Sequence, residues 1–280
     1  MFCIWMHFEN IHLTKKEYTI VSDQLPSGLV GTRFVMLSDL HNNQFGKNNE
    51  ALIKAIRQVQ PEFILVAGDM LVSKEHQNYE VAYNLLAELV KSYPIYYAYG
   101  NHEQRLKKRE ENDENMEPSF FLYEKQLKEL GVIILDNETI RVERNGSHMD
   151  ITGVSIDLGY FKKFPRPNME VQYLKETIGE KKAFTILIAH NPDYFQQYAQ
   201  WGADLVLSGH IHGGMVRLPF LGGVVSPQFR LFPKYDSGYF KEEVQQNTSQ
   251  MIISRGLGIH TIKIRVFNRP ELVVINLEKR

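Results

Sequence analysis

The sequence has little cysteine and no excess of either charge. Cys3 is its single cysteine, which rules out an internal disulfide and a metal site built from several thiolates. Its 32 lysine and arginine residues nearly balance 33 aspartate and glutamate residues, so the formal net charge is −1. Nucleic-acid-binding surfaces are usually strongly basic, and this balance therefore argues against nucleic acid as a partner without excluding it.

The amino-terminal stretch is too short for a membrane span. Residues 1–8 are mostly apolar, but a bilayer needs about 20 such residues, and the stretch has neither a basic segment nor a cleavage site. We expect residues 1–15 to be an N-terminal stub, either an apolar flap on the protein or the remnant of an anchor. Residues 16–280 have an ordinary globular composition and are long enough for one large domain.

Five short apolar runs each end at residues that can bind a metal. These residues are Asp39 and His41, Asp69, Asn101 and His102, His190, and His210 and His212. Apolar runs without alternation are typical of strands buried on both faces. Ligands of open α/β sheets bind at the carboxyl ends of the strands, so we expect the five endings to meet in one crevice.

The rest of the chain predicts further strands and helices around these runs. Alternation of strands and helices between residues 33 and 99 predicts right-handed crossovers and a largely parallel half-sheet. Helices are expected near residues 48–60, 78–91, 119–130 and 192–200; strands are expected at 16–21 (an edge strand), 33–38, 63–67, 95–99, 132–135, 139–142, 149–154, 184–189, 205–208, 251–254, 262–267 and 271–277, the last three of antiparallel character.

Two segments have no clear periodicity. Residues 104–117 carry a mixed charge run, which is typical of a solvated loop or helix face; the alternative is a mobile rim over the crevice. Residues 213–240 are rich in glycine, proline and aromatic side chains and predict an irregular loop.

Taken together, the motifs resemble those of the calcineurin-like metallophosphoesterase superfamily. The matching motifs are Asp39-x-His41, Gly68-Asp69, Gly100-Asn101-His102-Glu103, His190 and Gly209-His210-x-His212. The resemblance implies an α/β fold, a four-layer α-β-β-α sandwich of two mixed sheets flanked by helices, with two metal ions at the strand ends. One ion would be held by Asp39, His41 and His212, the other by Asn101, His190 and His210, and Asp69 would bridge them. His102 would contact the substrate instead of a metal.

These assignments imply a hydrolytic mechanism. The cofactor would be two divalent or mixed-valence ions. Two divalent ions, with Asp39, Asp69 and one bridging hydroxide, give a net charge of about +1, and the hydroxide would attack phosphorus in line. His102 would donate a proton or hydrogen bond to the leaving oxygen. A ligand set of nitrogen and oxygen atoms without sulfur fits Mn, Fe or Zn. Arg255 and Arg105 are candidate substrate contacts, although a structural ion pair is an equal alternative for Arg255.

Within the superfamily, the chain resembles one bacterial branch. The resemblance is carried by Ser38-Asp39-Leu40-His41, by residues 254–258 and by Asn268-Arg269-Pro270-Glu271. That branch holds enzymes akin to UDP-diacylglucosamine pyrophosphohydrolases and cell-envelope phosphoesterases. It implies a small-molecule or lipid-linked phosphoester substrate, and membrane association through an anchor that is missing from this chain. As the chain stands we expect a cytoplasmic protein; the alternative is a membrane-anchored one with its catalytic domain outside the cytoplasm.

The interpretation that these motifs favour is a binuclear phosphoesterase acting on phosphodiester or pyrophosphate bonds. The alternatives are a phosphomonoesterase or a nuclease of the same fold, or a non-catalytic scaffold that binds proteins. Five further histidines are expected outside the site. His7, His12, His76 and His148 should be surface residues, and His260 should serve core or turn packing.

Overall fold

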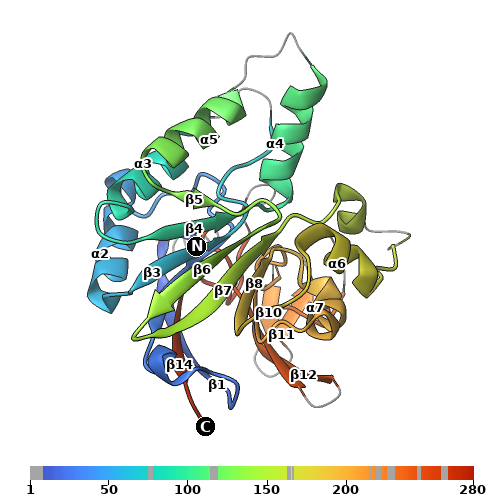
Figure 1. Ribbon diagram of the computed structural model, residues 1–280. Helices are drawn as coiled ribbons and strands as arrows, with labels where there is room; N and C mark the ends of the chain where they lie inside the picture. Colours follow the sequence, from blue (N-terminus) through green and yellow to red (C-terminus); the bar gives the residue numbers. More distant parts are fainter. Residues whose placement is uncertain are drawn as a thin grey trace.

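Two six-stranded sheets lie face to face in the centre of the computed structural model (Figure 1). The structure describes residues 9–74, 78–113, 119–162, 165, 167–214, 216–218, 222–225, 231–244, 247–259 and 264–280. The first sheet has the strand order β1-β14-β2-β3-β4-β5, and the second has the order β12-β13-β9-β8-β7-β6.

The first sheet combines the amino-terminal half of the chain with its last strand. Its strands are β1 (Thr14–Val21), β14 (Glu271–Glu278), β2 (Arg33–Leu37), β3 (Phe63–Ala67), β4 (Ile95–Ala98) and β5 (Ile133–Ile134). Strands β2 to β5 run parallel, as predicted for those between residues 33 and 99, while β14 is antiparallel to β2 and parallel to β1. The sheet is therefore mixed, and β1 is an edge strand as expected.

The second sheet is mixed in the same way. Its strands are β6 (Glu138–Arg144), β7 (Ser147–Val154), β8 (Thr185–Ala189), β9 (Leu205–Ser208), β13 (Asn247–Ile253) and β12 (Gly238–Val244). Strands β7, β8, β9 and β13 run parallel, and β6 and β12 close the two edges in antiparallel pairs.

Helices cover the outer face of each sheet. On the first sheet lie α2 (Glu50–Val59), α3 (Glu80–Leu89) and α5 (Ser119–Glu129), and α4 (Asn101–Asn112) rises beside α5 from beyond the end of β4. On the second lie α6 (Val171–Ile178) and α7 (Phe195–Trp201), the latter preceded by a short 3-10 turn at Pro192–Tyr194. Figure 1 shows these two helical layers on opposite sides of the paired sheets. The four-layer α-β-β-α sandwich expected from the sequence is confirmed.

Alternate side chains of each buried strand enter different layers. Val35 and Leu37 of β2 pack under the helices of the first sheet, whereas Phe34 and Met36 face the second sheet. A strand places successive side chains on opposite faces, so a strand between two apolar layers must be apolar throughout. This is why the five runs show no polar alternation in the sequence.

Three expectations fail in the carboxyl-terminal third. Residues 213–240 are not irregular throughout, because they contain the hairpin strands β10 (Val216–Leu218) and β11 (Gly222–Val225) and the start of β12. The expected strand at 262–267 is wrong for its described part, residues 264–267, where Val266 makes one isolated bridge to Val216. The tail strands are not simply antiparallel: β13 lies inside the second sheet, parallel to β9.

The mixed charge run lies on a helix that is partly exposed. It forms most of α4, which ends at Asn112, and the part after Asp113 lies outside the described residues.

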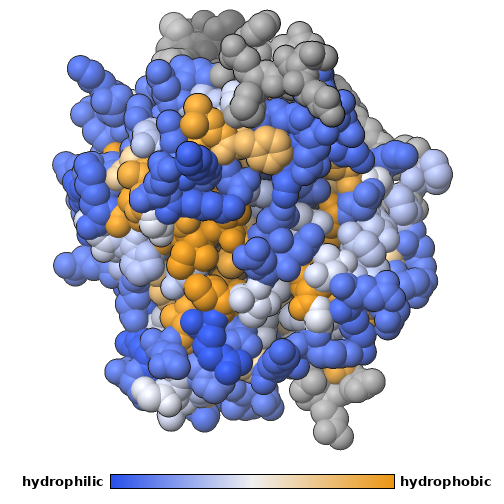
Figure 2. Space-filling model, turned by 45° about the horizontal axis from the view of Figure 1, so that its top comes forward, coloured by the Kyte–Doolittle hydropathy of each residue, from blue (hydrophilic) through white to orange (hydrophobic). Residues whose placement is uncertain are grey.

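Figure 2 brings the top of the Figure 1 view forward and shows a mainly hydrophilic surface with apolar side chains gathered near its middle. Of the helices in the described part of the chain, none combines the length and apolar character that a membrane crossing needs.

Candidate metal centre

All eight predicted metal-site and catalytic residues lie just beyond the carboxyl ends of five strands. Strand β2 ends two residues before Asp39, and β3 ends two residues before Asp69. Asn101 and His102 open α4 after β4, His190 follows β8, and His210 and His212 follow β9. Because the inner strands of both sheets end at the same side, these residues meet in one place.

The loops that carry these side chains have unusual backbone conformations. Five site residues have left-handed φ angles: Asp39 (52°), His41 (47°), Asp69 (55°), His210 (71°) and His212 (54°). A positive φ is uncommon for residues other than glycine, and such strain is concentrated at functional sites, where surrounding packing holds it in place. The loops are therefore shaped to aim side chains rather than to minimise local backbone energy.

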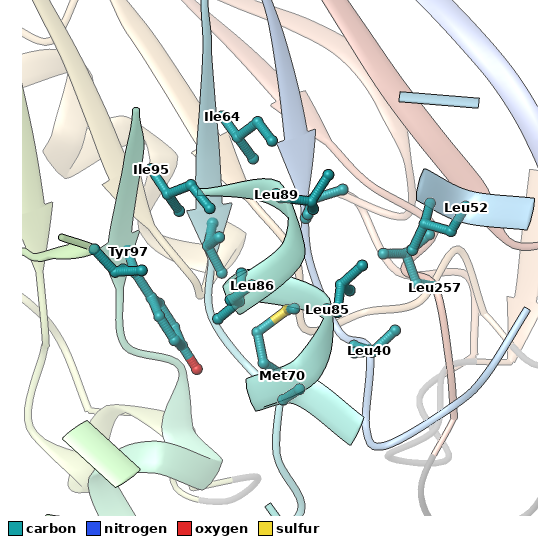
Figure 3. Close-up of a cluster of buried hydrophobic side chains, with 14 of the residues drawn as sticks. Leu40, Leu52, Ile64, Met70, Leu85, Leu86, Leu89, Ile95, Tyr97 and Leu257 are labelled. Carbon is teal, nitrogen blue, oxygen red and sulfur yellow. The ribbon is translucent and has the colours of Figure 1, made fainter. Parts of the chain in front are cut away.

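Apolar neighbours anchor these strained loops in the core. Leu40 lies between Asp39 and His41 in the sequence, Met70 follows Asp69, and both side chains are fully buried. Figure 3 shows Leu40 and Met70 in the apolar cluster beneath α3, together with Leu257. These two loops thus place a polar side chain in the crevice and the apolar side chain next to it in the core.

Two glycines allow the loops to approach each other closely. A Cβ atom on Gly100 would lie 2.2 Å from Oδ1 of Asp69, and one on Gly209 would lie 2.3 Å from Oδ2 of Asp39. Carbon atoms do not approach oxygen so closely without displacement, so any side chain at either position would push a carboxylate out of place.

The first group of candidate ligands is Asp39, His41 and His212. Oδ1 of Asp39 lies 3.4 Å from Nε2 of His212 and 3.8 Å from Nε2 of His41. The two histidine Nε2 atoms are 3.3 Å apart. These atoms are close enough to be ligands of one ion, and all three residues are buried.

The second group is Asp69, His190 and His210, with Asn101 beside it. Nε2 of His190 lies 3.0 Å from Oδ2 of Asp69, and one end of the Asn101 amide lies 2.8 Å from Nδ1 of His210. Ligand atoms of Asp69, His190 and His210 are close enough to hold a second ion. Oδ2 of Asp69 also lies 3.9 Å from Nε2 of His41, so this carboxylate faces both groups.

Backbone carbonyls orient three of the histidines. Nδ1 of His41 contacts the carbonyl of Leu71 at 2.9 Å, that of His190 contacts Ala67 at 2.6 Å, and that of His212 contacts Gly258 at 3.0 Å. A carbonyl only accepts, so Nδ1 carries a proton in each of the three rings, and Nε2 is the nitrogen that faces the crevice. This is the support that metal-binding histidines usually have.

The electrostatics of the two ligand groups favour a bound cation. Burial lowers the pKa values of His41 and His210 well below the ordinary value, so both are neutral imidazoles with a lone pair to give. Burial also acts to lower the pKa of His190, but Asp69 and Asp39 outweigh it and raise this pKa to about 10. Between His190 and Asp69 there is thus a strong preference for positive charge, which a proton or a metal ion would satisfy.

A buried ring nitrogen that has no well-aligned hydrogen bond within the described residues is a second observation, beside the electrostatics, that fits a metal centre. Nε2 of His190 is buried and makes no well-aligned hydrogen bond, although Asp69 is its near neighbour. In the crevice, lone pairs and carboxylate oxygens face one another, an arrangement that costs free energy unless a cation lies between them.

His102 is held differently from the other histidines. The backbone N–H of Ser73 donates to Nδ1 of His102 at 2.8 Å, so in the neutral ring the proton is on Nε2, which lies 3.9 Å from Oδ2 of Asp69. The backbone N–H of His102 donates to Oδ1 of Asp69 at 2.8 Å. The ring therefore presents a donor to the crevice, although His41, Asp69 and His102 are also close enough to form a third ligand group.

Glu103 holds the backbone around Asp69 and Gly100 through hydrogen bonds, a role that the motif alone did not indicate. Its carboxylate accepts hydrogen bonds from the backbone N–H groups of Asp69 (2.8 Å), Leu71 (3.1 Å) and Gly100 (3.0 Å) and from the Tyr97 hydroxyl (2.9 Å). Burial, and then the charge of Asp69, raise the pKa of Glu103 to about 7. The only sequence signal for this residue is its place in Gly100-Asn101-His102-Glu103.

The two candidate arginines differ in position. Nη1 of Arg105 lies 3.0 Å from the Asn101 amide, at the site. Arg255 lies 3.2 Å from Oε2 of Glu271, which is the ion pair left open by the sequence. His12 and His148 are exposed, as expected, while His7, His76 and His260 lie outside the described residues.

Comparison with known proteins gives the family. The sequence model of calcineurin-like phosphoesterases matches residues 32–214. The uncharacterized metallophosphoesterase YkuE of Bacillus subtilis (strain 168) is 25% identical over 268 residues, which cover 94% of this chain and 84% of the relative. The phosphodiesterase YaeI of Escherichia coli (strain K12) is 24% identical over 248 residues, covering 88% of this chain and 82% of the relative.

The family match includes the residues that form both ligand groups, from Asp39 to His212. Buried nitrogen and oxygen ligands at strand ends and the four-layer fold agree with it. The chain therefore belongs to the calcineurin-like phosphoesterase family and is a metal-dependent phosphohydrolase.

Proposed function

We propose that this protein is a binuclear metallophosphoesterase that hydrolyses phosphodiester or pyrophosphate bonds. Asp39, His41 and His212 would hold one ion, Asn101, His190 and His210 the other, and Asp69 would bridge them. Residues 16–280 would act as one catalytic domain, because the site takes side chains from both sheets. YaeI of Escherichia coli, a relative of this chain, is named a phosphodiesterase.

The position of Asp69 carries the proposal. Its Oδ2 atom lies 3.9 Å from Nε2 of His41 in the first group and 3.0 Å from Nε2 of His190 in the second. Asp69 also belongs to two close ligand groups, whereas Asp39 belongs to one, although Oδ1 of Asp39 lies 3.8 Å from Nε2 of His190. A carboxylate shared in this way reduces the repulsion between two cations, which a single-ion site would not require. Asp39 and Asp69 together offset two of the four positive charges of two divalent ions.

The residues around the ions would divide the remaining work. When bound, two such ions supply positive charge to the phosphoryl oxygens and lower the pKa of a water molecule. His102 would hold its Nε2 proton toward the leaving oxygen, because Ser73 fixes the other ring nitrogen as an acceptor. Arg105 would contact a phosphoryl oxygen from the start of α4.

The ligand types limit which metals fit the site, and the charge of the chain limits which substrates fit it. Nitrogen and oxygen ligands without sulfur suit Mn, Fe or Zn. Phosphoesters of small molecules are the substrate class, and a lipid-linked phosphoester is the finer proposal. The net charge of −1 argues against nucleic acid.

We expect a preference for diesters over monoesters. A monoester carries about two negative charges near neutral pH and a diester one, and a dianion benefits only if cations add to the metals. Arg105 is near the site, but Arg255 is held by Glu271 at 3.2 Å. After correction for uncatalysed rates, kcat/KM for an aryl phosphodiester should exceed that for the matching monoester roughly tenfold, or about 1.4 kcal/mol.

The assay uses one metal-loaded preparation for both substrates, with the chelated sample as the blank. A nucleotide pyrophosphate and a lipid-linked diester, assayed in parallel, separate the two bond types and the two sources of substrate. A clear monoester preference after correction would contradict the proposal and assign the chain as a phosphomonoesterase.

A further inference from the structure

Arg265 is a fully buried arginine just before β14, outside the proposed ligand set. Its relative exposure is 0%, and it is among the largest fully buried side chains of the described residues. Burial lowers its pKa to about 10, so it stays charged at neutral pH. A buried charge is costly unless it is well hydrogen-bonded, and Arg265 therefore requires a structural or functional explanation.

The guanidinium group of Arg265 donates to four backbone carbonyls. Nη1 donates to Asn268 at 2.9 Å, and Nη2 donates to Arg255 (3.1 Å), Gly256 (3.2 Å) and Gly258 (3.0 Å). Three of the four acceptors belong to the loop at residues 255–258. The planar guanidinium group of arginine has several N–H donors in fixed directions, so it can bind carbonyls on different sides. The single ammonium group of lysine does this less well.

This loop lies directly against the first ligand group. The Gly258 carbonyl that accepts from Arg265 also accepts from Nδ1 of His212 at 3.0 Å. The backbone N–H of Gly258 donates to the Asp39 carbonyl at 2.6 Å, and that of Leu257 donates to the Ser38 carbonyl at 3.0 Å. Leu257 itself is anchored in the apolar cluster shown in Figure 3.

Asn268, which is held by Arg265, supports His212 from its backbone side. The Asn268 amide donates to the carbonyl of His212 at 2.7 Å and to that of Gly214. The ring of His212 is thus fixed through Gly258, and its backbone is fixed through Asn268. Arg265 is hydrogen-bonded to both supports.

We propose that Arg265 is a positioning residue for the ion held by Asp39, His41 and His212. It fixes the loop at residues 255–258 and Asn268, and these aim Nε2 of His212 into the crevice. Within the described residues, Arg265 donates neither to His190 nor to the Ala67 carbonyl that orients His190 at 2.6 Å. The inference rests on the proposed division of the ligands between two ions.

The main test is Arg265→Lys, which keeps the buried charge, and the control is Arg269→Met. Arg269 is close in sequence, but its side chain is 42% exposed and pairs with Glu9. Mn²⁺ bound per chain is measured at increasing free Mn²⁺ by elemental analysis after equilibrium dialysis. Arg265→Lys should need roughly 10–100 times more free Mn²⁺ for one of its two ions and should bind the other normally. Arg269→Met should match the wild type.

Two further variants, each combined with Arg265→Lys, show which of the two ions is bound more weakly. In His190→Ala, which should keep only the first ion, adding Arg265→Lys should remove most of the remaining Mn²⁺. In His212→Ala, which should keep only the second ion, adding Arg265→Lys should change binding little, because the two changes act on the same ion. The ion retained by Arg265→Lys also reports that the variant is folded, and thermal unfolding of the metal-free proteins gives an independent check.

The possible failures are distinguishable. If the wild type binds two ions and Arg265→Lys binds both normally, or weakens both equally, the positioning role of Arg265 is wrong and the binuclear proposal stands. The same holds if Arg269→Met has the same effect. If the wild type binds one ion and His212→Ala leaves it unchanged, the proposed ligand division fails, and this inference fails with it.

Discussion

Asp69→Ala should lose both metal ions and at least roughly 10³-fold in kcat, the equivalent of several kcal/mol of charge stabilisation. Asp69 belongs to two of the close ligand groups, with Oδ2 3.0 Å from Nε2 of His190 and 3.9 Å from that of His41. Asp39 belongs to one of them, although its Oδ1 also lies 3.8 Å from Nε2 of His190. The other oxygen of Asp69 accepts from the backbone N–H of His102 at 2.8 Å, so removing it also releases the start of α4. Metal content and kcat are measured at the same free Mn²⁺ concentration.

Asp39→Ala is the matched comparison, because it removes a buried carboxylate of the same size from one ligand group. Oδ1 of Asp39 lies 3.4 Å from Nε2 of His212, and we expect this variant to lose mainly the first ion. A greater loss of total metal in Asp39→Ala than in Asp69→Ala would contradict the bridging role of Asp69.

His102→Ala should keep both metal ions and lose roughly 10²–10⁴-fold in kcat. Ser73 donates to Nδ1, which places the ring proton on Nε2 at the crevice, where it can be given to a leaving oxygen. The variant is assayed per bound metal pair, so that any loss of metal is counted separately from any loss of turnover.

A comparison of substrates with different leaving groups tests whether His102 is a proton donor. A nitrophenolate needs little help from an acid, whereas an alkoxide needs a proton, so the defect of His102→Ala should be larger for an alkyl ester. His41, Asp69 and His102 are also close enough to bind a metal together. A variant that lost one ion but kept normal turnover per bound pair would show that His102 is a ligand and not a proton donor.

Much of the fold could be predicted because its buried strands lie between apolar layers. In β2, Phe34 and Met36 face one layer and Val35 and Leu37 the other, which leaves an unbroken apolar run in the sequence. Runs of this kind also show where the strands end, and the polar residue that follows each end is a candidate site residue. Local pattern was sufficient for these elements.

The carboxyl-terminal third was harder because its structure depends on distant partners. Strand β14 pairs with β1, which lies at the other end of the chain, and β13 lies next to β9 inside the second sheet. The direction and place of such strands are set by long-range packing, which period and composition do not reveal.

The supporting residues of the site were not predicted for a similar reason. Ser73 donates its own backbone N–H to His102, Glu103 accepts from backbone N–H groups, and Arg265 donates to backbone carbonyls. Ser73 and Arg265 have no special spacing from the candidate ligands in the sequence, and Glu103 follows His102 in its motif without any sign of what it contacts. Only the folded positions of these loops identify them.

The most direct test of the binuclear proposal is the number of metal ions per active chain. The protein is purified without added chelator, its concentration is determined by amino-acid analysis, and Mn, Fe and Zn are counted by elemental mass spectrometry. We expect two ions per chain, loss of phosphodiesterase activity when they are removed by chelation, and recovery when Mn²⁺ is returned. Full activity in a chain that holds one ion, or no transition metal, would contradict it.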